Sequence, residues 1–261
     1  MVYLGDNVLV EGIEGFVRRF SEEDADAMVL LTQVPDPRKF GVAEFDERGR
    51  LKRLVEKPKV PPSIYALVGV YFFRPPYIFR AVELLKPSWR GELEITDAIQ
   101  KLIDWGLKVD YAVVKGWWKD TGTPEDILEA NRLLLEYKYR EVVIKGKVEE
   151  GARIEGRVYV DEGAVISSRS IIRGPAYIGK NTIVGPNTYV GPYTSIGDNC
   201  RLANVEIENS VVMDNVVIEN IDGRITDSLL GSGAKIKRRD RMPRGVRLIV
   251  GEHTVVEWRH E

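Results

Sequence analysis

The second half of the chain carries an apolar residue at every sixth position. A small side chain stands four residues after most of these positions, and several glycines follow the apolar residue directly, as at Gly179 and Gly185. The apolar series is Val148, Ile154, Val160, Ile166, Ile172, Ile178, Val184, Val190, Ile196 and Leu202. A six-residue period predicts a parallel β-helix of hexapeptide repeats, with the apolar residue pointing inward and the small residue filling a tight corner.

The corner positions and the end of the pattern refine this prediction. The expected corner residues are Ala164, Ser170, Ala176, Thr182, Thr188, Thr194 and Cys200. Repeats of this kind resemble left-handed β-helices, an exception to the right-handed rule for parallel crossovers. The register lapses where Glu208 takes the next sixth position, so looser spacing predicts irregular coils around Val211, Val217 and Ile225. Arg247 to Trp258 is expected to form a closing hairpin or cap.

The first half lacks this period and alternates strands with helices, which predicts a mixed α/β sheet. Strands are predicted at 2–4, 28–32 and 66–73, with 41–46 and 51–56 joined by a turn at Arg48-Gly49. Residues 2–4 read as a buried, central parallel strand, although no βα unit precedes them. The two patterns divide the chain into domains at residues 1–140 and 141–261.

Two helices in the first half have clear sequence signals. One starts at Ile95, keeps Ile99 and Leu102 on its apolar face, and ends at Gly106. The other starts after Thr123, where a hydroxyl cap, a proline and two acids follow in order. This second helix is expected to run to about residue 139 and to lead into the β-helix.

Composition narrows the possible functions. The 261 residues include 38 Lys and Arg against 40 Asp and Glu, a net charge of −2, so no global positive field is present to hold nucleic acid. No run approaches the roughly 18 apolar residues that a membrane-spanning helix needs. One cysteine and the lack of a signal-peptide pattern make the cytoplasm the expected location. With only two histidines, metal chemistry would depend on carboxylates.

Two aspartates are candidate metal ligands. Asp6 follows a predicted strand and a glycine, and Asp120 lies between a predicted strand and the capped helix. Carboxylates from two loops at the carboxyl edge of a sheet suit an octahedral Mg²⁺, with phosphate and water oxygens completing its shell. Taken alone, this spacing fits two unrelated loop acids at least as well.

Other candidate groups would bind a sugar phosphate. Glu56 can accept hydrogen bonds from sugar hydroxyls while the neighbouring Lys57 reaches a phosphate, and Arg90 can bind phosphate through its guanidinium fork. Trp117 and Trp118, with Trp105 further back in the chain, can line a sugar pocket, although aromatic residues in such positions more often belong to the core.

Six segments in order, followed by the β-helix, resemble the sugar nucleotidyltransferases, specifically the long glucose-1-phosphate thymidylyltransferases. The matching segments are Tyr3-Leu4-Gly5-Asp6-Asn7, Phe40-Gly41-Val42, Val55-Glu56-Lys57-Pro58, Ala66 to Phe72, Pro87 to Asp97 and Trp117 to Thr123. The likeness continues through Ile225-Thr226-Asp227-Ser228 to Arg247-Leu248-Ile249-Val250-Gly251. It implies a Rossmann-like nucleotidyltransferase domain followed by a left-handed parallel β-helix, and it covers nearly the whole chain.

The resemblance also implies a reaction. An oxygen of a sugar 1-phosphate, glucose 1-phosphate first of all, attacks the α-phosphorus of a nucleoside triphosphate such as dTTP and expels pyrophosphate. Because the nucleophile is already an anion, no protein base is needed. By the same likeness Asp6 and Asp120 would hold Mg²⁺, and Lys57 and Arg90 would bind the sugar phosphate.

The sugar itself is assigned by the same resemblance. Glu56, with backbone groups of Gly41 and Val68, would bind the sugar hydroxyls, and Trp118 would line the pocket. Related transferases commonly associate through β-helix faces, so a homo-oligomer is expected.

The sequence departs from the family at its start. The family pattern Gly-x-Gly-Thr-Arg-Leu, whose backbone amides would cradle a triphosphate, is absent from the 261 residues. The expectation is therefore an N-terminally truncated domain that is weakly active or inactive alone, with an upstream-encoded polypeptide as a possible partner for the missing half.

Two other functions remain open. The first is a non-catalytic module that binds sugar phosphates or drives assembly. The second is acyl transfer, which related β-helices perform with a histidine base that residues 144–230 do not contain. A basic run beginning at Lys235 can bind an anion but fits a solvated rim better, and Cys200 fits corner packing better than reactivity.

Overall fold

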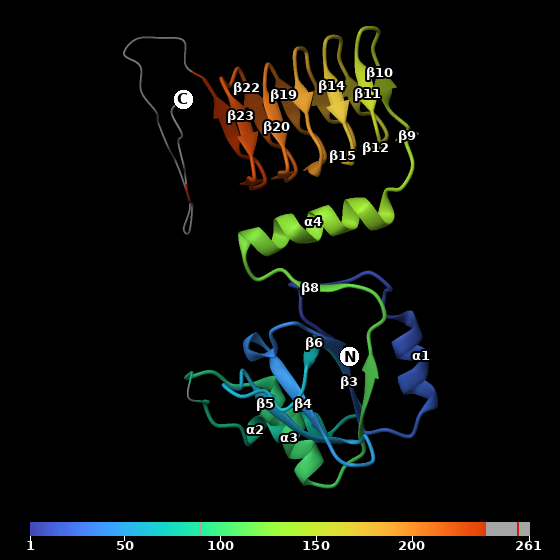
Figure 1. The fold of residues 1–261 in the computed structure, drawn as a ribbon, viewed down its shortest axis with the longest axis vertical. Helices are drawn as coiled ribbons and strands as arrows, with labels where there is room; N and C mark the ends of the chain where they lie inside the picture. The colour runs from blue at the N-terminus through green and yellow to red at the C-terminus, as the bar shows by residue number, and fades with distance from the viewer. Residues whose placement is uncertain (89, 239–254, 256–261) are drawn as a thin grey trace. The chain divides into compact units, whose positions relative to one another are not determined.

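The computed structural model describes residues 1–88, 90–238 and 255, and divides the chain into two compact units. The first comprises Met1–Lys138, and the second starts at Tyr139. Figure 1 shows a sheet with helices in the first unit and stacked short strands in the second. No helix in the described part of the chain is both long and apolar enough to cross a membrane.

The first unit is built on one mixed sheet. Its strand order is β5 (Leu51–Glu56), β4 (Gly41–Phe45), β6 (Tyr65–Phe73), β3 (Ala27–Gln33) and β7 (Val109–Val113), with β1 (Val2–Tyr3) pairing with β6. Only β3 and β7 run parallel among these described pairs, because a crossover connects them, whereas β4 and β5 form a hairpin. The predicted mixed sheet is confirmed.

Helices cover both faces of this sheet (Figure 1). On one face α1 (Glu14–Glu22) places Phe16 and Phe20 against the buried side chains of β3 and β6. On the other face lie α2 (Tyr77–Glu83) and α3 (Ile95–Asp104), and Ile99 and Leu102 of α3 are buried as predicted. α3 ends at Asp104, and Gly106, two residues further on, has the positive φ of +75° that favours glycine.

The prediction for the first strand is wrong. β1 is antiparallel to β6 rather than central and parallel, and its Val2 and Tyr3 are 40% and 41% exposed. The apolar residues suggested burial, but among the described residues β1 pairs only with β6. With a neighbouring strand on one side only, its side chains remain partly in water.

The remaining elements of the first unit carry the segments of chemical interest. A short antiparallel ribbon joins β2 (Asn7–Leu9) to β8 (Trp118–Asp120), and a 3₁₀ turn spans Pro37–Lys39. The helix α4 (Pro124–Lys138) is capped as predicted, since Thr123 Oγ1 accepts the Asp126 N–H at 3.2 Å.

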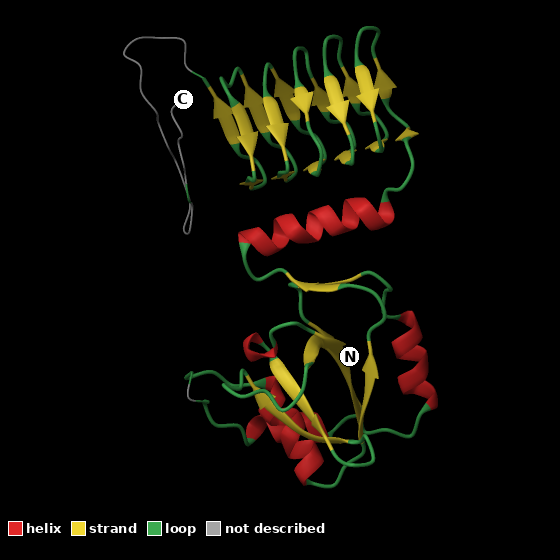
Figure 2. Cartoon of the chain, in the orientation of Figure 1, coloured by secondary structure: helices red, strands yellow, loops and turns green. Residues whose placement is uncertain are grey.

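The second unit is a parallel solenoid with three sheets (Figure 2). One sheet contains β10 (Lys147–Val148), β13 (Val165–Ile166), β16 (Ile183–Val184), β19 (Arg201–Ala203), β22 (Val217–Glu219) and β25 (Lys235–Lys237). The second contains β11 (Arg153–Glu155), β14 (Ile171–Arg173), β17 (Tyr189–Val190), β20 (Glu206–Glu208) and β23 (Arg224–Thr226). The third contains β9 (Val143–Ile144), β12 (Val158–Val160), β15 (Ala176–Ile178), β18 (Thr194–Ile196), β21 (Val211–Val212) and β24 (Leu229–Leu230). This arrangement is consistent with a left-handed β-helix.

The hexad pattern is confirmed in the interior of the solenoid. The predicted inward residues from Val160 to Leu202 are fully buried, and so are the corner residues, with Cys200 only 2% exposed. Val148 is 36% exposed, because β10 is the first strand of its sheet and has a neighbour on one side only.

The irregularity predicted after Leu202 appears in the length of the coils and not in their strand pairing. The strands continue to pair in parallel through β25, but the inward positions shift to Ile207, Val212 and Ile218. The coil shortens here, since equivalent corner residues are 18 apart at Asn181 and 16 apart at Asn204. The sequence period therefore breaks while the structural repeat does not.

Asparagines build the corners of the coils. Asn187, Asn204 and Asn220 have φ between 50° and 58°, and their side chains form a ladder. The Asn187 amide donates to Asn204 at 2.9 Å, and the Asn204 amide donates to Asn220 at 2.6 Å. Asparagine tolerates this left-handed backbone better than other residues with a side chain, so each coil can turn sharply.

The end of the chain is only partly described. Of the predicted basic run, Lys237 pairs with Glu219 at 2.8 Å and Arg238 pairs with Asp222, as expected for a solvated rim. Apart from Val255, the predicted closing segment Arg247–Trp258 lies outside the described residues.

Candidate active site

The ribbon of β2 and β8 brings the two candidate aspartates together. Asn7 pairs with Asp120 across the ribbon, and the Thr121 N–H and hydroxyl both donate to the Asp6 carbonyl, at 2.7 and 2.8 Å. Asp6 and Thr121 are 115 positions apart in the sequence. The ribbon thus holds two distant loop acids side by side, as the metal hypothesis requires.

The electrostatics of this pair fit a cation. Burial, and then the charge of Asp6, raise the pKa of Asp120. Asp120 Oδ1 is buried without a hydrogen-bond partner among the described residues. A buried carboxylate oxygen that lacks a donor and lies in the field of a second carboxylate is stabilised by a bound divalent cation. The donor set consists of two hard oxygen ligands, which suits Mg²⁺.

No larger acidic cluster surrounds this pair. In the described ranges, no group of three or more His, Cys, Asp or Glu is placed to hold a metal. A Mg²⁺ ion held by Asp6 and Asp120 would therefore take its other ligands from water and from substrate phosphates, the usual arrangement for this ion.

Glu56 is the centre of a second cluster. It lies at the end of β5 opposite Gly41 on β4, and its Oε2 accepts the Thr96 hydroxyl at 3.1 Å. A Cβ atom on Gly41 would lie 2.7 Å from the Thr96 methyl and 3.1 Å from Glu56 Oε2, so only glycine fits there. Burial is the main cause that raises the pKa of Glu56. The Glu56 side chain is 17% exposed, so its carboxylate can still accept ligand hydroxyls.

Arg90 lies in the same cluster and is surrounded by acids. Its guanidinium is 2.8 Å from Glu92, 3.3 Å from Glu94 and 3.9 Å from Glu56. The side chain is 23% exposed, whereas that of Glu92 is 58% exposed. Arg90 is thus positioned beside Glu56, and a phosphate that reaches it would compete with the exposed Glu92 carboxylate.

Lys57 connects the two clusters electrostatically. Its charge acts to lower the pKa of both Asp120 and Glu56, which places the ammonium within range of each carboxylate. Its backbone has a φ of +40°, unusual for a residue with a side chain, and its N–H donates to the Phe40 carbonyl at 3.0 Å. A strained backbone at a predicted site residue supports a functional role.

The remaining predicted residues differ in their placement. Val68 is fully buried on β6, backbone included. The Trp118 ring packs edge-on against Phe40, with ring centres 5.3 Å apart. Its indole N–H donates to Asn7 Oδ1 at 2.6 Å. Trp118 therefore has only its ring surface left for a sugar.

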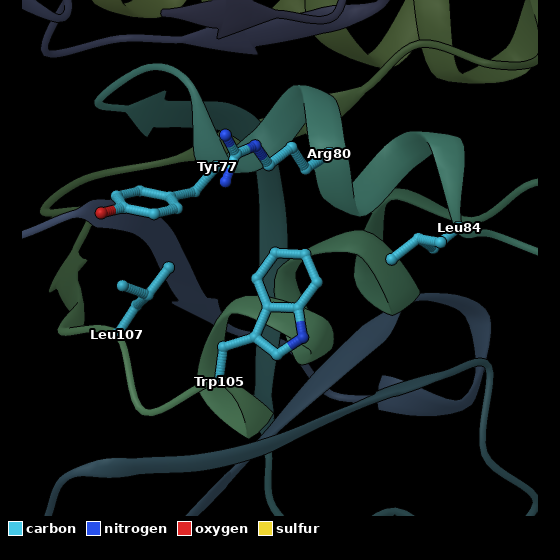
Figure 3. Close-up of a pocket in the computed structure, with 5 residues that line it drawn as sticks. All are labelled: Tyr77, Arg80, Leu84, Trp105 and Leu107. Carbon is cyan, nitrogen blue, oxygen red and sulfur yellow. The ribbon is translucent and has the colours of Figure 1, made fainter.

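The suggestion that Trp105 joins this pocket is wrong. It lines a separate hollow of about 310 Å³ with Tyr77, Arg80, Leu84 and Leu107 (Figure 3). Trp105 follows the C-terminal end of α3, whereas Thr96 of the Glu56 cluster lies in its first turn. The nine positions from Thr96 to Trp105 separate the two by about 14 Å along the helix.

Two residues of the site escaped the sequence analysis. Thr96 donates a hydrogen bond to Glu56. Its position in the family-like segment Pro87 to Asp97 could have indicated a role in the site. Asn7 is 9% exposed and bonds Asp6, Trp118 and the backbone of Gly69. Its position next to Asp6 could have indicated a role in the site. The neighbouring sequence did not show that distant residues such as Gly69 and Trp118 bond to it.

Comparison with known proteins agrees with this geometry. Residues 1–137 match the family described as nucleotidyl transferase, and residues 172–259 match the GMPPB C-terminal domain. The chain is 51% identical over 255 residues to the low-salt glycan biosynthesis nucleotidyltransferase Agl11 of Haloferax volcanii, covering 97% of this chain and 70% of the relative. It is 46% identical over 258 residues to a glucose-1-phosphate thymidylyltransferase of Streptomyces antibioticus, covering 98% and 71%. On these matches the chain belongs to the nucleotidyl transferase family, among the enzymes that act on sugar phosphates.

Proposed function

We propose that the first unit binds a sugar 1-phosphate, glucose 1-phosphate first of all, and joins it to the nucleotidyl group of a nucleoside triphosphate such as dTTP. The observation that carries this proposal is the pairing of Asp6 with Asp120, whose buried Oδ1 has no partner in the described structure. The name of the Streptomyces relative supports glucose 1-phosphate and dTTP as the first substrates to test.

The chemistry of each side chain suggests its role in the reaction. Asp6 and Asp120 would hold Mg²⁺, which when bound supplies positive charge to the reacting phosphates. Lys57 and Arg90 would bind the phosphate of the sugar and keep its oxygen in line with the α-phosphorus. That oxygen forms the new P–O bond, the α–β bridge breaks, and pyrophosphate leaves with the electron pair. No proton moves, because the nucleophile is an anion.

Glu56 would select the sugar. Its carboxylate accepts two hydroxyl donors readily, and in this structure Thr96 already provides one. Backbone groups of Gly41 and Val68 are the remaining sugar contacts that the family likeness implies, and position 41 must be glycine because a Cβ atom there would lie 2.7 Å from the Thr96 methyl. Positioning and charge stabilisation are sufficient for this class of reaction.

The test separates binding from turnover. Calorimetric titration with glucose 1-phosphate in Mg²⁺ should show binding that Glu56→Gln weakens about 10- to 100-fold, the range for a charged hydrogen bond. Pyrophosphate release with dTTP or UTP should fall at least about 100-fold in Asp120→Asn. Asp24→Asn, at an exposed position, is the matched control and should change neither quantity.

Two outcomes would contradict the proposal in different ways. If wild-type protein does not bind glucose 1-phosphate, the assignment of the Glu56 cluster fails. If it binds the sugar phosphate but neither this chain nor the chain extended upstream in its genomic frame releases pyrophosphate with either nucleotide, the non-catalytic binding module becomes the better description.

A further inference from the structure

Asn7 connects the two strands that carry the candidate metal ligands. Its side-chain oxygen accepts the Gly69 N–H at 3.1 Å and the Trp118 indole N–H at 2.6 Å, and its amide nitrogen donates to Asp6 Oδ1 at 2.8 Å. The residue is only 9% exposed. One buried side chain therefore joins Asp6, the strand of Asp120 and the central strand β6.

The orientation of the Asn7 amide is fixed by its partners. The Gly69 N–H and the indole N–H are donors only, so the oxygen must face them and the NH₂ group must face Asp6. Space is also limited, because a Cβ atom on Gly69 would lie 2.5 Å from Asn7 Nδ2. The amide can neither turn over nor move toward β6.

This fixed amide acts on one oxygen of Asp6. The hydrogen bond engages Oδ1, which leaves Oδ2 as the oxygen for a cation. The Thr121 contacts to the Asp6 carbonyl hold the backbone but not the carboxylate. In the described structure, Asn7 is the residue that orients the carboxylate itself.

We infer that Asn7 is a positioning residue, which holds the Asp6 carboxylate in the orientation that a divalent cation needs beside Asp120. This inference rests on the proposed function of the two aspartates. Groups that orient metal ligands commonly change metal affinity 10- to 100-fold when they are removed.

The experiment measures Mn²⁺ affinity of the full chain by electron paramagnetic resonance, without substrate. Asn7→Ala should weaken Mn²⁺ binding about 10- to 100-fold. Leu102→Ala, which empties a buried position on α3, is the control for lost stability and should leave the Mn²⁺ affinity unchanged. All measurements are made below the unfolding temperature of each variant.

A second variant tests the route of the effect. Trp118→Phe keeps a ring but removes one of the two donors that fix the Asn7 amide, so it should weaken Mn²⁺ binding about 3-fold. If Trp118 acts through Asn7, Trp118→Phe should not change the Mn²⁺ affinity of a protein that already carries Asn7→Ala. Fully additive effects would show that Trp118 acts on the site independently.

The outcomes separate this inference from the proposed function. Asn7→Ala or Trp118→Phe with the wild-type Mn²⁺ affinity would overturn the positioning role. If instead wild-type protein binds no Mn²⁺, or Asp120→Asn binds it equally well, the metal site itself is wrong and the proposed function loses its main support.

Discussion

At the scale of single residues, Glu56 carries a charge that the fold disfavours. Burial raises its pKa above the ordinary value of 4.5, so the folded protein holds that proton more tightly than the unfolded chain does. The free energy of unfolding must then decrease as the pH rises from 4.5 through the folded pKa.

The predicted consequence is that Glu56→Gln stabilises the protein at neutral pH. We expect its Tm to exceed that of the wild type by about 1–4 °C at pH 7 and to show no gain at pH 3.5. Thermal unfolding followed by circular dichroism measures this, with the exposed Glu47→Gln as control. An equal or lower Tm at pH 7 would show that hydrogen bonding to Thr96 outweighs burial.

Glu92 provides a second prediction for a single residue. It forms the shortest ion pair of Arg90, at 2.8 Å, yet its side chain is 58% exposed. Removing its charge should free the guanidinium, so Glu92→Gln is expected to bind glucose 1-phosphate about 2- to 5-fold more tightly, the range for an exposed ion pair. Calorimetric titration measures the change, and weaker binding would mean that Glu92 helps to hold the ligand.

At the scale of elements, the success of the sequence analysis depended on how locally each element is specified. The solenoid was predictable because the same six-residue signal recurs many times, and α4 because its cap and first turn lie together. The burial of β1 was not predictable, since it depends on which strands lie beside it. The meeting of Asp6 with Asp120 depended on a ribbon between distant segments, so only the family likeness indicated it.

The corner asparagines give a prediction for the coil as an element. Asn204 has a φ of +53° and bonds both neighbouring coils. Asn204→Ala should lose both bonds and add backbone strain, a total of about 2–3 kcal/mol, whereas Asn204→Gly keeps the favourable φ and should lose only about 1–2 kcal/mol. Urea unfolding of the two variants tests this order, and an alanine variant as stable as the glycine variant would contradict it.

At the scale of the whole molecule, the hydrophobic cores are separate. Among the described residues, the solenoid core is built from the second unit alone, and the three other clusters are built from the first. Damage to one core should therefore leave the chemistry of the other unit intact.

Ile172→Ala tests this separation. It truncates a fully buried side chain in the solenoid and should lower the free energy of unfolding of that unit by about 2–5 kcal/mol. The Mn²⁺ affinity of the protein should remain that of the wild type below the unfolding temperature. Calorimetry measures the free energy of unfolding, and electron paramagnetic resonance measures the Mn²⁺ affinity. A changed Mn²⁺ affinity would show that the two units are coupled.

The shortened coils near Asn204 show that coils of different length can stack in one solenoid. Coils of 18 and 16 residues share one stack, and each advances the axis by the spacing of paired strands, about 4.8 Å. Every coil presents the same pattern of backbone hydrogen-bonding groups to the coils on either side. Insertion or loss of one complete coil therefore changes the length of the solenoid by a fixed amount and preserves the hydrogen bonds between the remaining coils. The second unit can therefore lengthen or shorten by whole coils, each of which adds or removes about 4.8 Å along the solenoid axis.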